Sequence, residues 1–509
     1  MLSQLCRDLP VTIRAAEDSR VDGITLDSRK VQPGIIFAAA IDAYRNGEDY
    51  IRDAVSRKAT AVMAARDPNI GDTPLILTEN VRQMLGVMAH RIEGDPTKDM
   101  LLIAVTGTNA KTTFTYVMEA ILIGDGRLVG AVGTVTHRYG GQEFSAPNTT
   151  PEAPALARFF RKMHDFGVRN AVIEASSHGL SLERVAGCRF NVGVFTNLSR
   201  DHLDFHRDDE DYLAAKMKLF TQHLKSNGEQ GLAIINIDDP AGKRIAAACR
   251  VRTATYGENQ DAAYRIESYA ADSAGLALNM MTPQGALSLR SPLLGHFQAY
   301  NIAAAVATAL ELSIPKETII DAIESMPCVP GRMERVPDDD IDVIVDYAHT
   351  PAAVQIVTET ARKMARGRLI TIFGCGGDRD HGKRPLMAGA AASASDITVV
   401  TSDNPRTEDP SSIISDILGG VDLPQSDRLE DGDLADYEGR QGIFVEGDRR
   451  KAIRQTIQAA RSGDLILIVG KGHEDYQIIG KEKFHLDDRE EAKKALAARH
   501  SNNVKQGKL

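Results

Sequence analysis

Residues 101–113, which read LLIAVTGTNAKTT, constrain the fold and chemistry of this chain more than any other stretch. Leu101 to Val105 is an apolar run of strand length, and a loop of small polar residues follows it. Lys111 and Thr112 then open a segment with helical periodicity. This layout is typical of a phosphate-binding loop, because the free backbone N–H groups and the dipole at a helix start favour an anion.

The loop departs from the common nucleotide-binding pattern G-x-x-x-x-G-K-[ST] at two positions. The first glycine of the pattern corresponds to Val105 and the second to Ala110. If the backbone at Ala110 requires a positive φ, alanine costs about 1 kcal/mol more than glycine there. An ordinary strand–turn–helix therefore stays open as an alternative when this stretch is taken alone.

Length and composition predict a globular protein with several domains. At 509 residues the chain is too long for one hydrophobic core, so we expect about three domains. The net charge of −10 argues against a broad nucleic-acid or anionic-membrane surface. The five cysteines are widely spaced and include no C-x-x-C pair, which favours neither a disulfide framework nor a zinc site. No apolar run approaches the roughly 18 residues of a membrane helix, so a cytoplasmic location is the expectation.

Strand and helix patterns alternate along the chain and predict an α/β protein with three segments, 1–98, 99–330 and 331–509. Arg91 to Lys98 is interpreted as the first linker. In the third segment, apolar runs followed by polar or Gly-rich residues predict a doubly wound domain with a mostly parallel sheet. These runs are Asp342–Val345, Leu369–Phe373, Ile397–Thr401, Ile443–Val445 and Leu465–Val469.

Polar residues follow two expected strands of the second segment. Glu174 comes directly after the run Asn170–Ile173, and His202 lies in the polar string after Val192–Thr196. Open α/β sheets bind ligands at the carboxyl ends of their strands. Two adjacent strand ends with this composition therefore indicate a ligand site.

Two further polar residues lie in helical patterns. Lys216 falls within a pattern over 211–224, where a solvated face is the ordinary interpretation. Asn301 opens an Ala-rich helix, which it could cap, or it could contact a base. The Gly-rich string at Gly374 does not match the dinucleotide pattern G-x-G-x-x-G, because the third glycine would fall on Arg379.

The string T-G-T-N-x-K-T-T, with E-x-S-S-H at Glu174 and L-x-x-D-H at His202, resembles the Mur ligase family over nearly the whole chain. Members of this family form amide bonds with ATP in peptidoglycan precursor synthesis. The resemblance implies three domains, which would be a UDP-sugar-binding domain at 1–98, a central P-loop-type ATPase domain with a mostly parallel sheet at 99–330, and a C-terminal Rossmann-like amino-acid-binding domain at 331–509.

The string Asp403-Asn404-Pro405-Arg406 is similar to the motif by which some Mur ligases recognise meso-diaminopimelate. Lysine-adding members carry a different string at this place. The chemistry agrees with the resemblance, because an arginine fork suits the second carboxylate that diaminopimelate has and lysine lacks.

The resemblance also implies roles for individual residues at matching positions. The ATP-binding residues would be Gly107, Thr108, Asn109, Ala110, Lys111, Thr112, Thr113, Asn301, Arg332 and His349. The Mg²⁺ ligands would be Thr112, Glu174, His202 and Lys216, the last as a carbamate, and the catalytic residues would be Lys111, Lys216, Glu174 and His202. The UDP-muramoyl dipeptide would contact Leu26, Ser28, Asn148, Thr149, Thr150, Ser176 and Arg184. Diaminopimelate would contact Arg379, Asp403, Asn404, Pro405, Arg406, Gly470 and Glu474.

The implied reaction adds meso-diaminopimelate to UDP-N-acetylmuramoyl-L-alanyl-D-glutamate through an acyl phosphate. ATP and Mg²⁺ would be the cofactors. The expected partners are small-molecule substrates, with no nucleic acid and no membrane insertion, and the chain is expected to be a monomer.

Departures from the family pattern keep alternatives open. Relatives commonly have Gln at the position of Leu182, Gly at that of Asp42 and Asp at that of Asn46. An acidic group at Asp42 would sit poorly beside a pyrophosphate. A paralogue with another acceptor is therefore one alternative, and a non-catalytic nucleotide-binding protein, suggested by Ala110, is the other.

Overall fold

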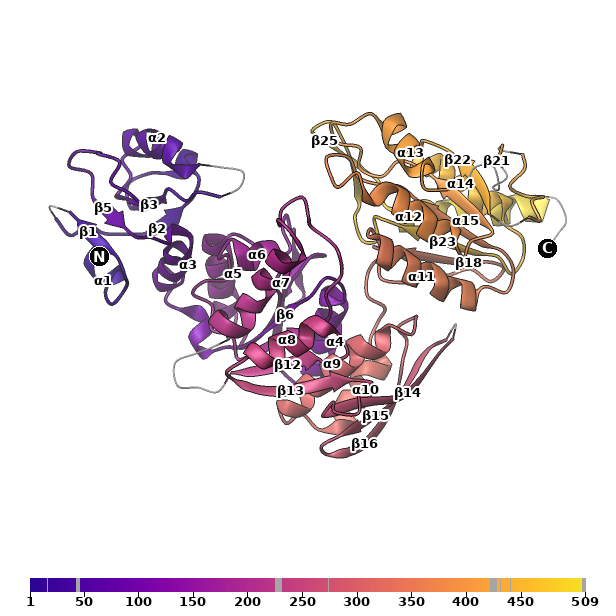
Figure 1. Cartoon of the computed structure of the whole chain (residues 1–509), viewed down its shortest axis with the longest axis horizontal. Coiled ribbons are helices and arrows are strands. Elements are labelled where there is room, and N and C mark those ends of the chain that lie inside the picture. The colour runs from indigo at the N-terminus through magenta and orange to yellow at the C-terminus, as the bar shows by residue number, and fades with distance from the viewer. Residues whose placement is uncertain are drawn as a thin grey trace. The chain divides into compact units, whose positions relative to one another are not determined.

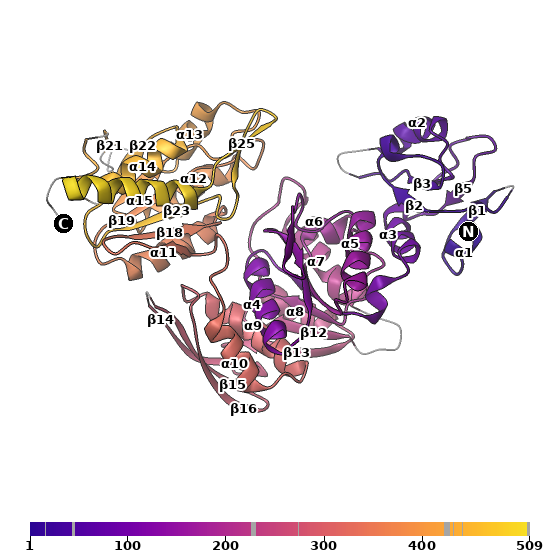
Figure 2. The same ribbon diagram turned by 180° about the vertical axis from the view of Figure 1, so that it is seen from behind.

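The computed structural model describes residues 1–15, 17–42, 46–224, 231–272, 274–421, 428–430, 432–439 and 441–505, with side chains as far as 501. Its contacts divide the chain into two compact units. The first contains Met1–Leu198, Phe205–Arg265 and Ala303–Ala322, and the second contains Ser199–Asp204, Ile266–Ile302 and Ile323–Leu509. Each unit is an α/β structure, and the labelled elements can be followed in Figures 1 and 2.

The first sheet of the first unit has the strand order β1-β5-β4-β3-β2, with β2 to β5 parallel and β1 antiparallel. Its strands are β1 (Thr12–Arg14), β2 (Gly23–Thr25), β3 (Ile35–Ala38), β4 (Ala61–Ala64) and β5 (Leu75–Leu77). Its helices are α1 (Leu2–Leu5), η1 (Ser28–Lys30), η2 (Gly47–Tyr50), α2 (Ile51–Ser56) and α3 (Val81–Ile92). Successive side chains of a strand face opposite sides, so Ile36 packs with α3 while Phe37 packs with α2.

The second sheet of this unit carries the predicted nucleotide loop. Its strands β13, β12, β11, β6, β10 and β7 are parallel neighbours in this order, and β8 and β9 extend it as antiparallel strands. The strands are β6 (Leu101–Thr106), β7 (Val129–Val132), β8 (His137–Tyr139), β9 (Gln142–Phe144), β10 (Asn170–Glu174), β11 (Val192–Phe195), β12 (Leu232–Asn236) and β13 (Arg252–Gly257). The helices are η3 (Pro96–Asp99), α4 (Lys111–Gly124), α5 (Ala153–Asp165), α6 (Ser177–Ser181), α7 (Asp209–Lys218), the π-helical turn η4 (Leu219–His223) and α8 (Pro240–Ala248).

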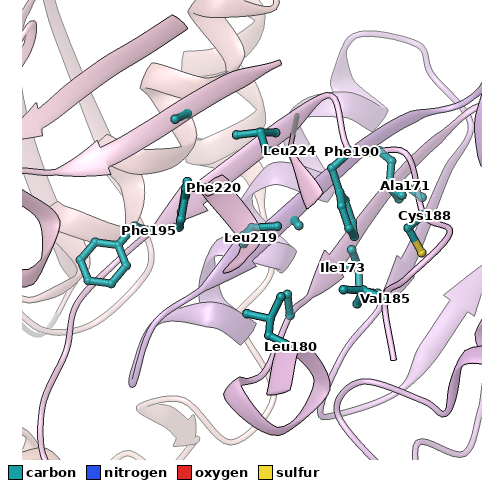
Figure 3. Close-up of a cluster of buried hydrophobic side chains, with 14 of the residues drawn as sticks. Ala171, Ile173, Leu180, Val185, Cys188, Phe190, Phe195, Leu219, Phe220 and Leu224 are labelled. Atoms are coloured by element: carbon teal, nitrogen blue, oxygen red, sulfur yellow. The ribbon is translucent and has the colours of Figure 1, made fainter. Parts of the chain in front are cut away.

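One face of this second sheet packs a hydrophobic core against α5, α6, α7 and α8. Alternate residues such as Ala171 and Ile173 of β10 point into it, and Phe220 and Leu224 reach it from the segment after α7. Figure 3 shows this cluster. The central strands β6 and β10 are buried on both faces, which explains why each is a continuous apolar run rather than an alternating pattern.

The segment from Tyr264 to Ser325 contributes to both units. Its elements are β14 (Tyr264–Asp272), β15 (Gly275–Thr282), β16 (Gly285–Ser291), α9 (Gln298–Glu311) and α10 (Lys316–Ser325). Strands β15 and β16 form an antiparallel hairpin in the second unit.

The sheet of the second unit has the order β17-β18-β23-β19-β20-β22-β21, and all pairs except β17–β18 are parallel. Its strands are β17 (Glu334–Val336), β18 (Asp342–Asp346), β19 (Leu369–Phe373), β20 (Ile397–Val400), β21 (Arg428–Leu429), β22 (Gly442–Val445) and β23 (Leu465–Val469). The helices are α11 (Pro351–Met364), α12 (Lys383–Ala392), α13 (Pro410–Leu418), α14 (Arg449–Ala459) and α15 (Asp488–Lys505), and β24 (Tyr476–Ile479) pairs with β25 (Glu482–His485).

Two hydrophobic cores show that this sheet is doubly wound, as predicted. Helices α11, α12 and α13 pack on one face, and α14 and α15 pack on the other. Figure 1 shows α11 and α12, and Figure 2 shows α15 from the opposite side.

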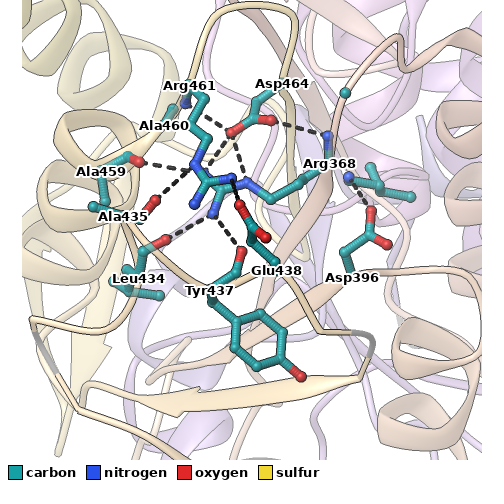
Figure 4. Close-up of polar contacts among 12 residues, drawn as sticks. Arg368, Asp396, Leu434, Ala435, Tyr437, Glu438, Ala459, Ala460, Arg461 and Asp464 are labelled. Atoms are coloured by element: carbon teal, nitrogen blue, oxygen red, sulfur yellow. Dashed lines mark hydrogen bonds and ion pairs between the residues drawn. The ribbon is translucent and has the colours of Figure 1, made fainter.

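A buried arginine holds the strands of this sheet at their amino-terminal ends. The guanidinium of Arg368 donates to the Asp464 carboxylate and to the carbonyls of Leu434, Tyr437 and Ala459 (Figure 4). Because a charge this enclosed needs several partners, the network fixes how the segment around Leu434 meets the sheet.

Three expectations about individual elements are wrong. Arg91 belongs to α3, so the linker begins after that helix. The pattern over 211–224 contains a helix that ends at Lys218 and a π-helical turn, and not one continuous α-helix. Asn301 lies inside α9, where its Nδ2 donates to Gln298 Oε1 at 2.7 Å, so it does not cap that helix. Each predicted segment contains its own sheet, while the boundaries at 98 and 330 stay predictions.

A buried ion pair at the start of α14 gives a stability prediction. Arg449 Nε and Nη2 donate to the two carboxylate oxygens of Asp488 at 2.8 and 2.6 Å, and both side chains are fully buried. Asp488→Asn should lower the free energy of unfolding by about 3–5 kcal/mol, because it leaves a buried guanidinium without its counter-charge. Chemical denaturation measures this change. The control Glu490→Gln, on the exposed face of α15, should change stability by less than about 1 kcal/mol.

Candidate active site

The loop between β6 and α4 is fixed by the end of the neighbouring strand β11. Thr108 N donates to Asn197 O at 2.8 Å, and Asn109 N donates to Asn197 Oδ1 at 2.9 Å. Thr196 Oγ1 donates to Asn109 O at 2.7 Å and would lie only 1.9 Å from a Cβ placed on Gly107. Position 107 therefore requires glycine, because a larger residue would displace the strand end that holds the loop.

The backbone at Ala110 has a positive φ, which is the condition under which alanine costs more free energy than glycine. Its φ and ψ are +76° and −16°, in the left-handed region, immediately before the first residue of α4. Alanine is strained in this conformation, whereas glycine is not. The departure from the common glycine thus carries an energetic cost but leaves the loop with the shape expected of a phosphate-binding loop.

Two lysine side chains point at the same loop. Lys111 Nζ donates to Gly107 O at 2.9 Å and to Thr108 O at 2.8 Å. Lys216 Nζ donates to Gly107 O at 2.8 Å and lies 4.2 Å from the centre of the Tyr212 ring. Lys216 is 1% exposed, so the interpretation as a solvated face is wrong. The π-helical turn after α7 does not disturb this contact, since Lys216 precedes it.

Glu174 ends β10 with its carboxylate buried. Its two oxygens accept from Thr134 N at 3.0 Å and from Thr134 Oγ1 at 2.8 Å. Gly133 makes room for this carboxylate, because a Cβ there would lie 2.4 Å from Glu174 Oε1. Thr112 lies in the first turn of α4 and is also buried. Among the residues that the structure describes, no cluster of three or more His, Cys, Asp or Glu could hold a metal ion.

The residues expected to contact the UDP-muramoyl dipeptide are partly brought together around Glu174. Thr149 Oγ1 lies 3.0 Å from Thr134 Oγ1, and Thr150 Oγ1 donates to Glu174 O at 2.8 Å. Thr150 Oγ1 also lies 3.0 Å from Ser176 Oγ, and Arg184 Nη1 donates to Thr150 O at 3.1 Å.

Two other expected dipeptide contacts lie at the first sheet. Ser28 is buried in η1, and its hydroxyl hydrogen-bonds the Asp53 carboxylate and lowers the pKa of that group. Leu26 packs against the hydrophobic core beside α3. Asn148 is exposed.

In the second unit, His202 has a φ of +56°, and its Nε2 lies 3.4 Å from the Asp201 carboxylate. Arg332 lies over the Tyr347 ring, 4.6 Å from its centre. His349 Nδ1 donates to Tyr347 O at 2.8 Å, and burial lowers the pKa of this imidazole, to which the nearby Lys383 ammonium adds. Arg332 and His349 therefore both contact Tyr347, Arg332 through the ring and His349 through the backbone carbonyl.

The string Asp403–Arg406 meets the loop after β23. Asn404 Oδ1 accepts from Lys471 Nζ at 3.1 Å and from Ile478 N at 2.9 Å, while Asn404 Nδ2 donates to Glu474 Oε2 at 3.0 Å. Lys471 Nζ also lies 3.1 Å from Asp403 Oδ1, and this lysine is fully buried. Asn404 thus joins the two segments that were expected to hold diaminopimelate.

Two arginines lie beside the Gly-rich loop after β19. Arg406, with a φ of +52°, donates from Nη1 to Gly377 O at 2.7 Å. A Cβ at Gly376 would lie 2.9 Å from Arg406 Nη1, so glycine leaves room for the Arg406 guanidinium beside this loop. Arg379 Nη1 lies 3.4 Å from Asp204 Oδ2.

The pKa values of the Asp403 and Glu474 carboxyl groups are shifted in opposite directions. Burial opposes ionisation of Asp403, but the charges of Lys471 and Arg449 hold the pKa of this carboxyl below its usual value. Burial raises the pKa of Glu474, and the Asp403 carboxylate raises it further. The site therefore holds one fixed negative charge and one carboxyl that an approaching cation would help to ionise.

Sequence reasoning missed Thr134, Asn197 and Lys471 as site residues. Asn197 lies two residues after the end of β11, so its place after a strand was an available signal. Lys471 stands between two glycines after β23, but a sequence does not distinguish a buried lysine from an exposed one. Thr134 gave no sequence signal, because its role comes from the packing of β7 beside β10.

Family models match most of the chain. The Mur ligase middle domain matches residues 105–309, and the Mur ligase glutamate ligase domain matches residues 331–472. The chain belongs to the Mur ligase family. A relative from Geobacter metallireducens, named UDP-N-acetylmuramoyl-L-alanyl-D-glutamate--2,6-diaminopimelate ligase, is 42% identical over 491 residues, which are 96% of each chain.

Solved structures agree with this family assignment. A structure of a UDP-N-acetylmuramoyl-L-alanyl-D-glutamate--2,6-diaminopimelate ligase is 34% identical, covers 94% of this chain and 95% of its own, and has a TM-score of 0.67. MurF from Acinetobacter baumannii is 16% identical, covers 92% of this chain and 94% of its own, and shares the fold with a TM-score of 0.62. The expected fold class of three α/β domains is confirmed for this Mur ligase. No helix in the described part of the chain is long and apolar enough to cross a membrane.

The strained alanine in the nucleotide loop gives a prediction. Ala110→Gly should raise the free energy of unfolding by about 1 kcal/mol and tighten ADP binding, because glycine adopts a positive φ without strain. Thermal unfolding and calorimetric titration with ADP measure both effects. The control Ala247→Gly, at an exposed position of α8, should destabilise by about 1 kcal/mol instead. Equal signs for the two variants would contradict the assignment of strain to position 110.

Proposed function

We propose that this Mur ligase adds meso-diaminopimelate to UDP-N-acetylmuramoyl-L-alanyl-D-glutamate with hydrolysis of ATP to ADP, in peptidoglycan precursor synthesis. The observation that carries this proposal is the joining of the Asp403–Arg406 string to the loop after β23 through Asn404 and Lys471. The printed name of the relative at 42% identity supports the same substrate pair. We further propose that the protein acts as a cytoplasmic monomer.

The proposed reaction has two steps. The γ-carboxylate of the D-glutamyl residue attacks the γ-phosphorus of ATP, and ADP leaves, which gives an acyl phosphate. The amine of meso-diaminopimelate then attacks the acyl carbon, inorganic phosphate leaves, and the amine loses a proton. This chain's contribution is to position the reactants and to offset their negative charge.

The nucleotide loop is suited to the ATP phosphates. Its backbone is fixed by Asn197, which leaves little reorganisation to occur when an anion binds. Lys111 places an ammonium group on the carbonyls of Gly107 and Thr108, and the Nζ of Lys216 contacts the carbonyl of Gly107 as well. We propose that Asn301, Arg332 and His349 contribute to nucleotide binding from the second unit.

Hard oxygen donors near the loop fit Mg²⁺, which would offset the charge of the phosphates when bound. Thr112 and the buried carboxylate of Glu174 supply such donors in the first unit. We propose that His202 and Lys216, as a carbamate, complete the set. A carbamate would account for a fully buried lysine at this place, because it replaces an ammonium with oxygen ligands.

The amino-acid subsite combines the charges that a zwitterionic end of diaminopimelate requires. Arg406 and Arg379 approach one Gly-rich loop and suit a carboxylate, while Asp403 and Glu474 suit an ammonium. Lysine would leave the arginines without a carboxylate partner, which adds to discrimination against it.

The proposal is tested by phosphate release from ATP with UDP-muramoyl dipeptide, comparing meso-diaminopimelate with L-lysine. Release that requires both the dipeptide and diaminopimelate is the expected result. Release with another acceptor only would favour the paralogue alternative, and no release with any acceptor would favour the non-catalytic alternative.

Lys216 gives a prediction that separates a carbamate from an ammonium. Lys216→Ala should lose nearly all ligase activity, and a short carboxylic acid added to the assay should restore part of it, because the missing group is an oxygen ligand. The control Lys243→Ala, at an exposed position of α8, should keep full activity and show no response to the acid. Rescue of Lys216→Ala by a short amine instead would contradict the carbamate.

Arg406 gives a prediction about the choice of amino acid. Arg406→Ala should raise the KM for meso-diaminopimelate by about ten- to a hundredfold, as expected for the loss of a charge-assisted hydrogen bond, and should leave the KM for ATP nearly unchanged. Steady-state kinetics with each amino acid measure this. Arg366→Ala, whose side chain is 81% exposed, is the matched control and should behave as the wild type. A wild type that uses lysine as well as diaminopimelate would refute the specificity.

A further inference from the structure

Asp42, Arg82, Glu152 and Arg184 form an ion-pair network in the first unit, outside the nucleotide loop. Arg82 Nη2 donates to Asp42 Oδ2 at 2.5 Å, and Arg82 Nη1 lies 3.3 Å from Glu152 Oε2. Arg184 Nη2 lies 2.9 Å from Glu152 Oε1. Arg82 Nη1 also donates to the carbonyl of Leu182 at 3.2 Å. Arg82 therefore connects the segment of the first sheet that contains Asp42 with two segments of the second sheet, at Glu152 and at Leu182.

The Asp42–Arg82 end of this ion-pair network is largely enclosed, whereas the side chain of Glu152 is 35% exposed. The side chains of Arg82 and Asp42 are 12% and 11% exposed, and that of Arg184 is 15% exposed. Arg82 Nε is buried and has no hydrogen-bond partner among the described residues. A guanidinium in this position acts on protein groups rather than on a ligand in solvent, and losing one of its partners would leave a charge without compensation.

This ion-pair network continues to the backbone of Glu174 at the end of β10. Arg184 donates to the carbonyl of Thr150, and Thr150 Oγ1 donates to the carbonyl of Glu174. Thr150 Oγ1 also accepts from Ser176 N at 3.0 Å. Contacts therefore run without a break from Asp42 in the first sheet's segment to the residues proposed to hold the acceptor.

Two departures from the family pattern converge on Arg82. Asp42 and Leu182 are two positions at which the resemblance above leads us to expect other residues, and both contact Arg82. The Arg82 guanidinium opposes the charge of Asp42 and donates to the backbone carbonyl of Leu182, which any side chain would leave in place. The two positions thus belong to one contact network around Arg82.

We propose that Arg82 is a positioning residue for the UDP-sugar acceptor, and that Asp42 sets its orientation. Arg82 holds Glu152, and Glu152 holds Arg184 against the Thr150 loop. Removal of Arg82 releases Glu152 to pair with Arg184 alone, which turns Arg184 away from the acceptor loop. This inference rests on the proposed function, because it assigns a role within the acceptor site.

The first test compares Arg82→Met with Arg57→Met. Arg57 directly follows α2 beside the same sheet, and the side chains of its ion pair with Asp53 are 45% and 40% exposed, so it controls for the loss of an arginine. Arg82→Met should raise the KM for UDP-muramoyl dipeptide about tenfold or more and leave the KM values for ATP and diaminopimelate within about twofold. Arg82→Lys keeps the charge but loses the planar fork, so its KM for UDP-muramoyl dipeptide should lie between those of the wild type and Arg82→Met.

A purely structural role would give a different result. It would lower the melting temperature and the fraction of active enzyme and would leave all three KM values unchanged. That outcome, or an equal rise in all three KM values, would overturn the inference while leaving the proposed function intact. A wild type that turns over no UDP-muramoyl dipeptide would overturn the proposed function itself, so the two failures are distinguishable.

A double-mutant cycle keeps the inference testable if Arg82→Met does not fold. Asp42→Asn removes the charge with little change of shape, and it should raise the KM for the dipeptide several-fold in the presence of Arg82. In Arg82→Lys, whose point charge does not match the Asp42 carboxylate as the fork does, the same change should have a clearly smaller effect. Additive effects of the two substitutions on this KM would overturn the proposed coupling.

Discussion

The site depends on the seating of the β6–α4 loop against the end of β11. Asn197 accepts hydrogen bonds from the backbone N–H groups of two successive loop residues, and Thr196 occupies the space that a side chain at Gly107 would need. Backbone N–H groups attract an anion only when they are held together, since a mobile loop would have to be ordered on binding. The parallel pairing of β6 with β11 supplies this order before any ligand arrives.

Buried charges organise the remaining parts of the site. Lys216 and Lys471 are both almost fully enclosed. Lys216 contacts the carbonyl of Gly107 in the nucleotide loop, and Lys471 contacts Asp403, Asn404 and the carbonyl of Tyr476. Enclosed charges of this kind are costly to leave unpaired. Their contribution to the net free energy of folding is therefore small, and their main effect is to fix the arrangement of the segments that they join. Recognition of charged substrates requires such a fixed arrangement.

Much of the site was predictable because its residues follow strands or open helices. The lysine and threonines after residue 110, Glu174 and the Asp403–Arg406 string all stand where local pattern alone marks the carboxyl edge of a sheet. Lys216 and Lys471 were harder, because the sequence of a helix or loop does not say which polar residue is buried. Asn301 was assigned a possible capping role that α9 excludes by beginning three residues earlier.

Apolar runs and short motifs depend on neighbours along the chain, so the α/β class, the nucleotide loop and the family could be inferred from the residues in order. The positive φ of Ala110, the contact of Lys216 with the loop and the pairing of Asp42 with Arg82 could not, because they depend on three-dimensional packing. These facts arise where segments distant in sequence pack together. Arg82 and Glu152, 70 residues apart, meet through the packing of α3 with α5, which no local pattern encodes.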